Sequence, residues 1–216
     1  MNRYLNLILL AAGNGERYGS NKLLTDINGK PTYRHIFDHL YHYCQDHVSD
    51  CEVTVVSQYD EILASAKAAG FSAVRNPRPE DGISLTIRLG LEAGIESNRE
   101  RQRNNSGGNR HQGTGSVFLT ADQPYVQYKS LEDLVLQACA ADKGIVSASH
   151  SGVSGNPVFF DEIYYPELMD LTGDIGGKHV MNRHLDDVAW FEMSPEELTD
   201  IDLPGSGNNR IRDLSE

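Results

Sequence analysis

The sequence has few cysteines, no long hydrophobic run and a shortage of positive charge, and each absence excludes a class of protein. Its three cysteines, Cys44, Cys51 and Cys139, lack CxxC spacing, which argues against a disulfide framework or a structural zinc site. No apolar run reaches the length of a membrane span, and no charged segment precedes a signal-peptide core at the N-terminus. We therefore expect a cytoplasmic protein that makes no membrane contact.

Acidic residues outnumber basic ones, giving a formal net charge of −12. A protein that grips nucleic acid normally presents excess lysine and arginine, so we expect no nucleic-acid partner. The 216 residues, 39% of them hydrophobic, predict a single domain over 1–216 with an ample core. The stretch 98–115 is rich in Asn, Gly and Arg and predicts a flexible surface insertion, whose arginines either face solvent or meet an anionic partner.

Apolar runs and helical periodicity alternate along the chain. The strands that we expect cover 5–10, 52–57, 73–75, 117–120 and 144–148. The helices that we expect cover 31–47, 60–69, 83 to about 96, and 131–141. This alternation predicts an α/β fold with three layers, in which a Rossmann-like, mostly parallel sheet carries helices on both faces and binds ligands at the carboxyl ends of its strands.

A glycine-rich loop follows the first expected strand, in NLILLAAGNGERYGSNKLL from Asn6 to Leu24. Glycines allow tight bends and close approach of a ligand, and inward-facing amides form a nest for anions. Arg17 and Lys22 add positive charge at the same rim. The loop is neither a GxxxxGK[ST] phosphate loop nor a complete GxGxxG dinucleotide fingerprint. From glycine spacing alone, an ordinary strand-to-helix turn remains an equal alternative.

The loop spells out LAAGxGxRxGxxK, and the chain resembles the nucleotidyltransferases that carry this signature, above all the molybdenum cofactor cytidylyltransferases with their MobA-like NTP transferase domain. Further segments occur in that family's order, namely NPRPEDGISLTIRLGL at 76–91, LTADQP at 119–124, GVSGNPVFF at 152–160, GDIGGK at 173–178 and DIDLP at 200–204. The resemblance thus extends over nearly the whole chain. It implies the nucleotidyltransferase (GT-A-like) variant of the α/β fold.

The resemblance also implies which residues bind the nucleotide and the metal. Asp122 and Asp202 match the family's ligands for Mg²⁺, the expected cofactor, whereas position alone makes Asp122 equally a turn cap. Arg17, Lys22 and Asp122 would be catalytic. The residues implied for nucleotide binding are Leu10, Ala11, Ala12, Gly13, Gly15, Lys22, Gly82, Ile83 and Ser84. Ala12 stands where guanylyl-transferring relatives usually have glycine, which favours CTP.

The acceptor would be a molybdopterin-type compound, bound by residues of two segments: Gly155, Asn156 and Pro157, then Asp174 and Lys178. Each of these is also a common turn or helix-cap residue, and the family usually has arginine at the position of Lys178. The implied activity is Mg²⁺-dependent transfer of CMP from CTP to molybdenum-bound molybdopterin, with a molybdoenzyme as a possible recipient. The alternatives are a guanylyltransferase, a sugar-phosphate nucleotidyltransferase, and a non-catalytic module that binds the nucleotide or the cofactor.

Overall fold

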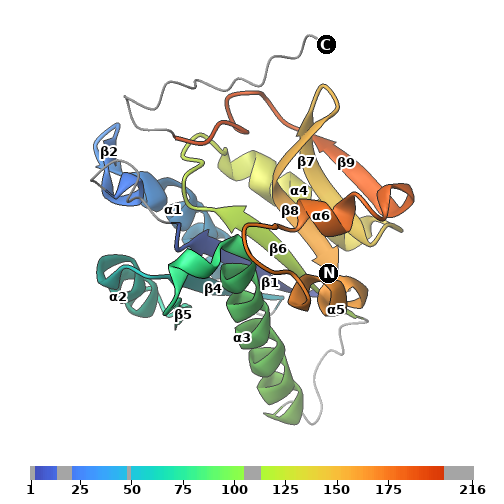
Figure 1. Cartoon of the computed structure of the whole chain (residues 1–216), viewed down its shortest axis with the longest axis horizontal. Coiled ribbons are helices and arrows are strands. Elements are labelled where there is room, and N and C mark those ends of the chain that lie inside the picture. Colours follow the sequence, from blue (N-terminus) through green and yellow to red (C-terminus); the bar gives the residue numbers. More distant parts are fainter. Residues whose placement is uncertain (1–2, 14–20, 48–49, 105–112, 202–216) are drawn as a thin grey trace.

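The computed structural model describes residues 3–13, 21–47, 50–104 and 113–201 of the chain. Their centre is a seven-stranded sheet with the strand order β5-β4-β1-β6-β8-β7-β9 (Figure 1). The strands are β1 (Arg3–Ala11), β4 (Cys51–Ser57), β5 (Ser72–Arg75), β6 (Gly113–Thr120), β7 (Ile145–His150), β8 (Val153–Asp161) and β9 (Val188–Glu192). A separate two-stranded ribbon pairs β2 (Asp26–Ile27) with β3 (Lys30–Pro31).

The sheet is mostly parallel, as the sequence predicts. β1 pairs in parallel with β4 and β6, β4 with β5, and β7 with β9. Within this seven-stranded sheet, as far as the structure describes it, β8 alone runs antiparallel to its neighbours, β6 and β7. Parallel pairing of β4, β1 and β6 brings their carboxyl ends to one edge of the sheet, where open α/β sheets bind their ligands.

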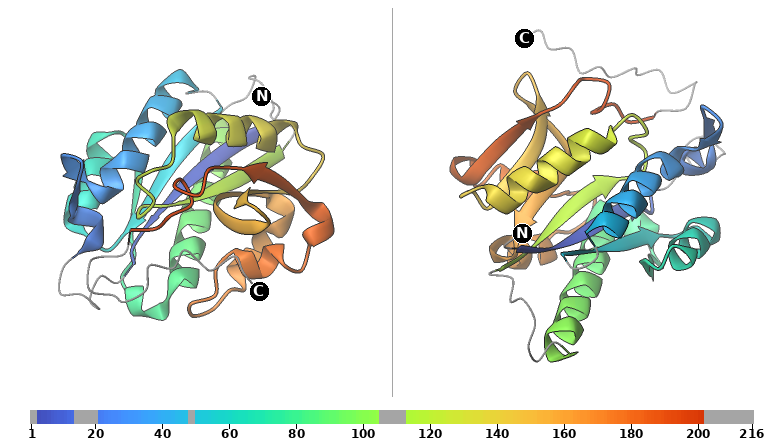
Figure 2. Two further views of the ribbon diagram at one scale, coloured as in Figure 1. Left: turned by 90° about the horizontal axis from the view of Figure 1, so that it is seen from above. Right: turned by 180° about the vertical axis from the view of Figure 1, so that it is seen from behind.

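Helices cover both faces of the sheet (Figure 2). One face carries α1 (Thr32–Asp46), α2 (Asp60–Ala68) and α4 (Tyr128–Ala140), and the other carries α3 (Ile83–Asn104), α5 (Tyr165–Met169) and α6 (Lys178–Met181). Short 3-10 turns occur at Lys22–Leu24, Pro79–Asp81, Glu162–Tyr164 and Leu185–Asp187. This three-layer α/β arrangement confirms the predicted fold class. Within the described ranges, no helix combines the length and apolar character needed to cross a bilayer.

On each face of the sheet, the helices pack against the strands through buried apolar side chains. In α1 the buried residues Ile36, Phe37 and Leu40 follow the spacing that places side chains on one helix face. On the opposite face, α3 lies close to β1 because two of its residues are glycines. A Cβ at Gly90 would come within 2.5 Å of Ile8, and one at Gly94 would overlap the side chain of Asn6. Larger residues there would push α3 off the sheet.

α3 continues to Asn104, well beyond the helix end near Glu96 that the sequence predicts. The expected flexible stretch 98–115 is therefore helical at its start and belongs to β6 from Gly113 onward, while 105–112 lies outside the described residues. The polar helix end is held by contacts that composition does not reveal. The guanidinium carbon of Arg101 lies 3.7 Å from the centre of the Tyr4 ring, and Arg101 also donates to Asn98 Oδ1 at 2.9 Å.

Candidate functional site

Two of the predicted site segments meet at the carboxyl ends of β1 and β6. Leu10 pairs with Thr120 in the parallel ladder, and the N–H of Ala121 donates to the carbonyl of Leu10 at 3.1 Å. Asp122 is the second residue after β6, and Ala12 is the first residue after β1. The structure thus brings the start of the glycine loop and the LTADQP segment side by side.

Lys22 reaches this edge of the sheet from the far end of the loop. Its Nζ lies 2.6 Å from Asp122 Oδ2, and the two side chains are 26% and 20% exposed. Lys22 begins a 3-10 turn that is capped by Asn21, whose Oδ1 accepts from the Leu23 N–H at 3.0 Å. The edge of the sheet therefore presents an ammonium group, which can bind a phosphate, beside a carboxylate, which can bind a cation.

The glycine loop begins with three residues whose carbonyls are bound by the end of β4. Ser57 Oγ donates to the Ala11 carbonyl at 2.8 Å, and Gln58 Nε2 donates to the Ala12 carbonyl at 3.0 Å. The Gly13 carbonyl accepts from Tyr59 Oη at 2.9 Å. The predicted loop residues Gly15 and Arg17 lie outside the described residues.

Sequence reasoning did not identify Ser57, Gln58 and Tyr59 as part of the site. One signal was present, because Ser57 ends an expected strand and Gln58 and Tyr59 follow it. The ends of neighbouring parallel strands share one edge of a sheet, and the glycine loop follows another such strand. Their contact spans 46 positions in the chain, beyond the reach of any local motif.

The segment predicted to read the base, Gly82 to Ser84, lies against the segment predicted to bind the acceptor. The backbone of Gly82 is in the left-handed region with φ 84°, and a Cβ there would come within 2.6 Å of Asp174 and within 2.4 Å of the Gly173 backbone. Ser84 N–H also donates to the Gly173 carbonyl at 3.2 Å. Nucleotide-side and acceptor-side residues therefore share one region of the molecule.

The side chains of this segment differ in their accessibility. Ile83 is 36% exposed, and Ile175 in the facing segment is 43% exposed. Ser84 is fully buried, and its hydroxyl has no hydrogen-bond partner among the described residues. The surface offered to a ligand here is thus the backbone and Ile83, and the hydroxyl faces the interior.

The predicted acceptor residues occupy two different elements. Gly155, Asn156 and Pro157 lie within β8, which corrects their interpretation as turn residues. They lie at an irregularity of that strand, since β7 pairs with residues 153–154 before them and 158–160 after them, and β6 pairs with 158–161. Lys178 is exposed and begins α6, as a helix-cap interpretation expects.

A C-terminal segment links the acceptor strand to Asp122. Leu198 lies over Gly155, where an added Cβ would approach it to 3.1 Å. Three residues later, the N–H of Ile201 donates to the carbonyl of Asp122 at 2.8 Å. Asp202, the second predicted metal ligand, is the next residue and lies outside the described residues.

Glu197 fixes this C-terminal segment to the loop after β6. Its carboxylate is only 7% exposed and accepts from the Gln127 N–H at 3.1 Å and from the Ser194 N–H at 3.2 Å and Oγ at 3.0 Å. Burial acts to raise the pKa of Glu197, but hydrogen bonds from the side chain of Ser130 and from Gln127 and Ser194 outweigh it and lower the pKa. Glu197 is thus an ionised anchor beside the candidate site.

Within the described part of the chain, no three His, Cys, Asp or Glu side chains form a cluster able to hold a metal ion. Asp122 is the one predicted metal ligand that the structure describes. Its carboxylate oxygens are the hard donors that Mg²⁺ prefers, and they lie at the strand edge beside Lys22. The carboxylate chemistry at this position suits a divalent cation.

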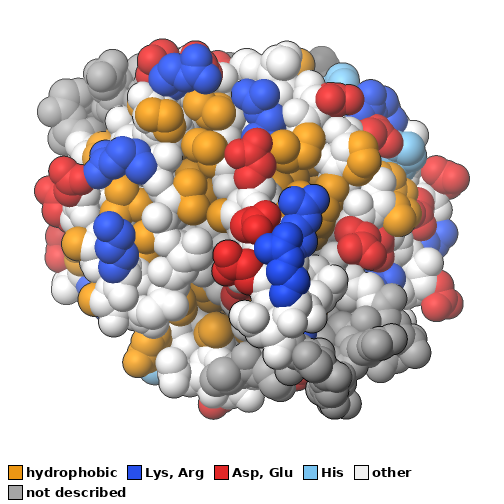
Figure 3. Space-filling view, turned by 90° about the horizontal axis from the view of Figure 1, so that it is seen from below, with side chains coloured by type: hydrophobic (Ala, Val, Ile, Leu, Met, Phe, Trp, Pro, Cys, Tyr) orange, Lys and Arg blue, Asp and Glu red, His pale blue; other side chains and the backbone are white. Residues whose placement is uncertain are grey.

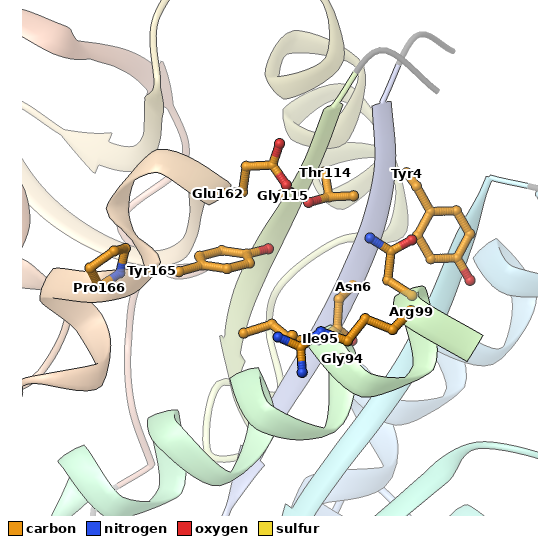
Figure 4. A pocket seen from close by; sticks show the side chains of 11 residues that line it. Tyr4, Asn6, Gly94, Ile95, Arg99, Thr114, Gly115, Glu162, Tyr165 and Pro166 are labelled. Atoms are coloured by element: carbon orange, nitrogen blue, oxygen red, sulfur yellow. Dashed lines mark hydrogen bonds between the residues drawn. The ribbon is translucent and has the colours of Figure 1, made fainter. Parts of the chain in front are cut away.

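A separate hollow of about 410 Å³ lies at the opposite ends of the strands, between α3, α5 and the starts of β1 and β6 (Figure 4). It is lined by Tyr4, Asn6, Gly94, Ile95, Asn98, Arg99, Thr114, Gly115, Glu162, Tyr165 and Pro166. None of the predicted site residues that the structure describes lines this hollow. It is therefore distinct from the Lys22–Asp122 region.

The arginines at the end of α3 are engaged within the protein. Arg99 and Arg103 pair with Glu96 at 3.5 and 3.7 Å. Figure 3 shows basic and acidic side chains interspersed on the face seen from below. Such a mixed surface differs from the broad basic field that nucleic-acid binders present.

Comparison with known proteins identifies the family and the fold. The sequence profile described as "MobA-like NTP transferase domain" matches residues 7–188. Purine catabolism protein PucB of Bacillus subtilis (strain 168) is 28% identical over 206 residues, which cover 93% of each chain. The 2-C-methyl-D-erythritol 4-phosphate cytidylyltransferase of Rhodopirellula baltica is 26% identical over 150 residues, which cover 68% of this chain and 60% of that protein.

Solved structures of similar fold include Rv0371c from Mycobacterium tuberculosis in complex with manganese. That structure has a TM-score of 0.62 and 17% identity, with 88% of each chain covered. The molybdopterin-guanine dinucleotide biosynthesis protein A from Archaeoglobus fulgidus has a TM-score of 0.54 and 16% identity, with 93% of each chain covered. At these identities the likeness concerns the fold.

Proposed function

The chain belongs to the MobA-like NTP transferase domain family and is a nucleotidyltransferase, and we propose that it transfers CMP from CTP to the phosphate of molybdenum-bound molybdopterin. Pyrophosphate is released. The observation that carries the proposal is the pairing of Lys22 with Asp122 at the joint edge of β1 and β6. Nucleotidyl transfer needs a positively charged side chain that binds the triphosphate and, close to it, a carboxylate that binds a metal ion. This edge provides both.

On the donor side, the backbone of the glycine loop would receive the nucleotide while Lys22 and Arg17 neutralise its phosphates. Gly82 and Ile83 would contact the base, with Ser84 buried behind them at the start of α3. The full set proposed for the nucleotide is Leu10, Ala11, Ala12, Gly13, Gly15, Lys22, Gly82, Ile83 and Ser84. Ala12 is the first residue after β1, and we propose that its methyl group limits the room for a two-ring base.

Asp122 and Asp202 would hold the divalent cation, for which we propose Mg²⁺. When bound, the cation would shield the triphosphate charge and steady the departing pyrophosphate. The hydrogen bond from Ile201 to the Asp122 carbonyl supports this pairing, since Asp202 follows Ile201 directly. The manganese in the Rv0371c structure of similar fold agrees with a divalent metal.

The reaction proceeds by attack of an acceptor phosphate oxygen on the α-phosphorus of CTP. The new P–O bond forms as the bond between the α-phosphorus and the oxygen bridging to the β-phosphorus breaks, and the electron pair leaves with pyrophosphate. An ionised phosphate is already a nucleophile, so alignment and charge neutralisation account for the catalysis without a general base. Gly155, Asn156 and Pro157, with Asp174 and Lys178, would hold the acceptor, and a molybdoenzyme would receive the product.

The relatives favour two further candidates for the specificity. The Archaeoglobus protein is named for guanine dinucleotide synthesis, which favours a guanylyltransferase. The Rhodopirellula enzyme is a cytidylyltransferase whose acceptor is a sugar-like phosphate, which favours CTP with another acceptor. Both candidates use the same Lys22–Asp122 site and differ only in the base or the acceptor.

A substrate matrix tests the proposal. CTP, GTP, ATP and UTP would each be offered with molybdenum-bound molybdopterin or with 2-C-methyl-D-erythritol 4-phosphate, and pyrophosphate and the nucleotide product would be measured. We expect kcat/KM for CTP to exceed kcat/KM for GTP by roughly tenfold to a hundredfold, the range that steric exclusion in a pocket allows. The Ala12→Gly variant should show a smaller ratio of the two constants. Predominant GMP transfer would overturn the cytidylyl assignment. Nucleotide binding without pyrophosphate release from any pair would indicate the non-catalytic module.

A further inference from the structure

The carbonyls at the end of β1 depart from the alternation of a regular strand. In a strand, successive carbonyls point to opposite neighbours. The Leu10 carbonyl accepts from Ala121 on the β6 side, and the Ala11 carbonyl accepts from Ser57 on the β4 side. The next carbonyl, of Ala12, should return to β6, but it accepts from Gln58 and so also faces β4.

The Gly13 carbonyl continues this departure. It accepts from Tyr59 Oη at 2.9 Å and from Gln58 Nε2 at 3.4 Å. Three successive carbonyls, of Ala11, Ala12 and Gly13, are therefore bound by three successive side chains, of Ser57, Gln58 and Tyr59. We call Ser57, Gln58 and Tyr59 the carbonyl clamp.

Holding these carbonyls determines where the amides point. Across a planar trans peptide, the C=O and the N–H point in opposite directions. The N–H groups of Ala12 and Gly13 thus face away from β4, toward the side of β6 and Asp122. Two successive amides on one side form the beginning of an anion nest, a feature that a regular strand does not offer.

The clamp is itself fixed by further contacts. Ser57 Oγ accepts from the Tyr59 N–H at 3.1 Å, which folds the chain back after β4. Arg75, at the end of β5, donates to the Gln58 carbonyl at 2.9 Å and also pairs with Asp60. The position of the clamp is therefore set by the end of the sheet, independently of any ligand.

We propose that the carbonyl clamp is a positioning device that aims the amides of Ala12 and Gly13 at the phosphates of the nucleoside triphosphate, an inference that rests on the proposed donor function. Gln58 and Tyr59 act through the loop backbone and need not touch the nucleotide. The regular ladder of β1 and β4 already pairs Ala11 with Ser57, so the sheet does not depend on the two outer bonds. Losing those bonds should affect phosphate binding much more than folding.

The test compares near-isosteric variants that remove donors from the clamp. Tyr59→Phe removes the hydroxyl, and Gln58→Met removes the amide at similar length. Tyr41→Phe removes a hydroxyl from a tyrosine of 38% exposure on α1 and serves as the control. The dissociation constants of CTP, CMP and magnesium pyrophosphate would be measured by calorimetry, with melting temperature and steady-state kcat and KM alongside.

In each clamp variant we expect the dissociation constants of CTP and magnesium pyrophosphate to rise by about three- to tenfold, which corresponds to the loss of one net hydrogen bond. The dissociation constant of CMP should change by less than about twofold. KM for CTP should rise while kcat and melting temperature stay near those of the parent. Unchanged CTP binding in both variants, equal weakening of CTP and CMP, or weakening explained by a lower melting temperature would overturn the clamp proposal. Failure of the parent to bind any nucleoside triphosphate would instead overturn the proposed function, and the clamp inference with it.

Discussion

Lys22 and Asp122 are 100 positions apart in the chain, and their side chains meet at 2.6 Å where two parallel strands end. The pair joins the last residue of the glycine-rich signature to the one described carboxylate of the predicted metal site. Binding a triphosphate with its cation would offer each side chain a second partner of opposite charge. The two residues should therefore contribute differently, Asp122 through the cation and Lys22 through the phosphates.

Replacing Asp122 with Ala or Asn should lower nucleotidyl transfer by about 10²–10³-fold, because an electrostatic contact to the reacting phosphates is lost. Pyrophosphate release measured over a range of Mg²⁺ concentrations checks this, and the Mg²⁺ requirement should rise. Asp133→Asn removes an exposed carboxylate from α4 and is the matched control. A folded Asp122 variant with parental turnover and Mg²⁺ dependence would exclude Asp122 from the mechanism.

Lys22→Ala should weaken CTP binding or slow transfer by roughly 10–100-fold, since a charge-assisted contact to phosphate disappears. Its effect on stability should stay below about 1 kcal/mol because the ion pair is partly exposed. Calorimetric titration with CTP and thermal melting separate the two effects. Lys129→Ala, on the surface of α4, should change neither quantity appreciably. Parental affinity and turnover in Lys22→Ala would contradict the phosphate role.

Glu197→Ala should lower the free energy of unfolding by about 1–3 kcal/mol, because buried N–H donors of Gln127 and Ser194 lose their acceptor. The sign of the pH dependence follows from the lowered pKa of Glu197 in the folded protein. The stabilisation is complete above the unfolded pKa of about 4.3 and is lost as the pH falls through the lower folded value. Urea melts from pH 6 to pH 3 should show a shallower loss of stability in Glu197→Gln than in the parent. Parallel pH profiles for the two proteins would refute the anchoring role.

Arg101→Ala should destabilise the protein by about 0.5–2 kcal/mol, since a cation lying over an aromatic ring is lost. Arg99→Ala, which removes only an exposed pair with Glu96, should change stability by less than about 0.5 kcal/mol. Replacing 98–104 with a Gly/Ser linker should therefore lower the melting temperature, contrary to what composition predicts. Equal melting temperatures for both point variants and the parent would show that the helix end contributes nothing.

Cys44 should be the most reactive thiol of the chain. A hydrogen bond from the Cys51 thiol lowers the pKa of Cys44 to about 7, while burial raises the pKa of Cys139. Mass mapping after brief iodoacetamide treatment at pH 7.5 should find Cys44 alkylated first, and Cys51→Ala, which removes the donor, should slow the reaction of Cys44. Because the two sulfurs are 4.0 Å apart, diamide should join Cys44 to Cys51 in preference to Cys139. Faster alkylation of Cys139 would contradict this order.

Much of the fold follows from the sequence because local pattern and tertiary structure agree. The predicted strand 52–57 and helix 60–69 match β4 and α2 within one residue at each end. The strand β8 was not predicted because Gly155, Asn156 and Pro157 are typical turn residues, and the pairs with β6 and β7 that make the segment a strand lie before and after these three residues. The end of α3 escaped because its polar residues are stabilised by Tyr4, a residue distant in sequence.

In the candidate site, too, some residues could be predicted from local motifs and others could not. Lys22, Asp122 and Ala12 could be identified from motifs that each lie within a short segment, and the structure brings them to one edge of the sheet. The clamp residues Gln58 and Tyr59 belong to no such motif. Their role arises from pairing between β1 and β4, which places the ends of two strands together and which local sequence does not encode.

The hydrogen bonds that join Glu197 and Ile201 to the loop after β6 also have a consequence for biosynthesis. A chain emerging from the ribosome has its N-terminal segments available first, so β1, β4 and β6 are free to associate before these late partners of Asp122 and Gln127 exist. A nascent chain halted before residue 193 would carry the glycine signature and Asp122. It would still lack the segment that holds the loop between β6 and α4 in place. Competence for catalysis should therefore arrive only once residues 194–202 have been translated, after most of the sheet has formed.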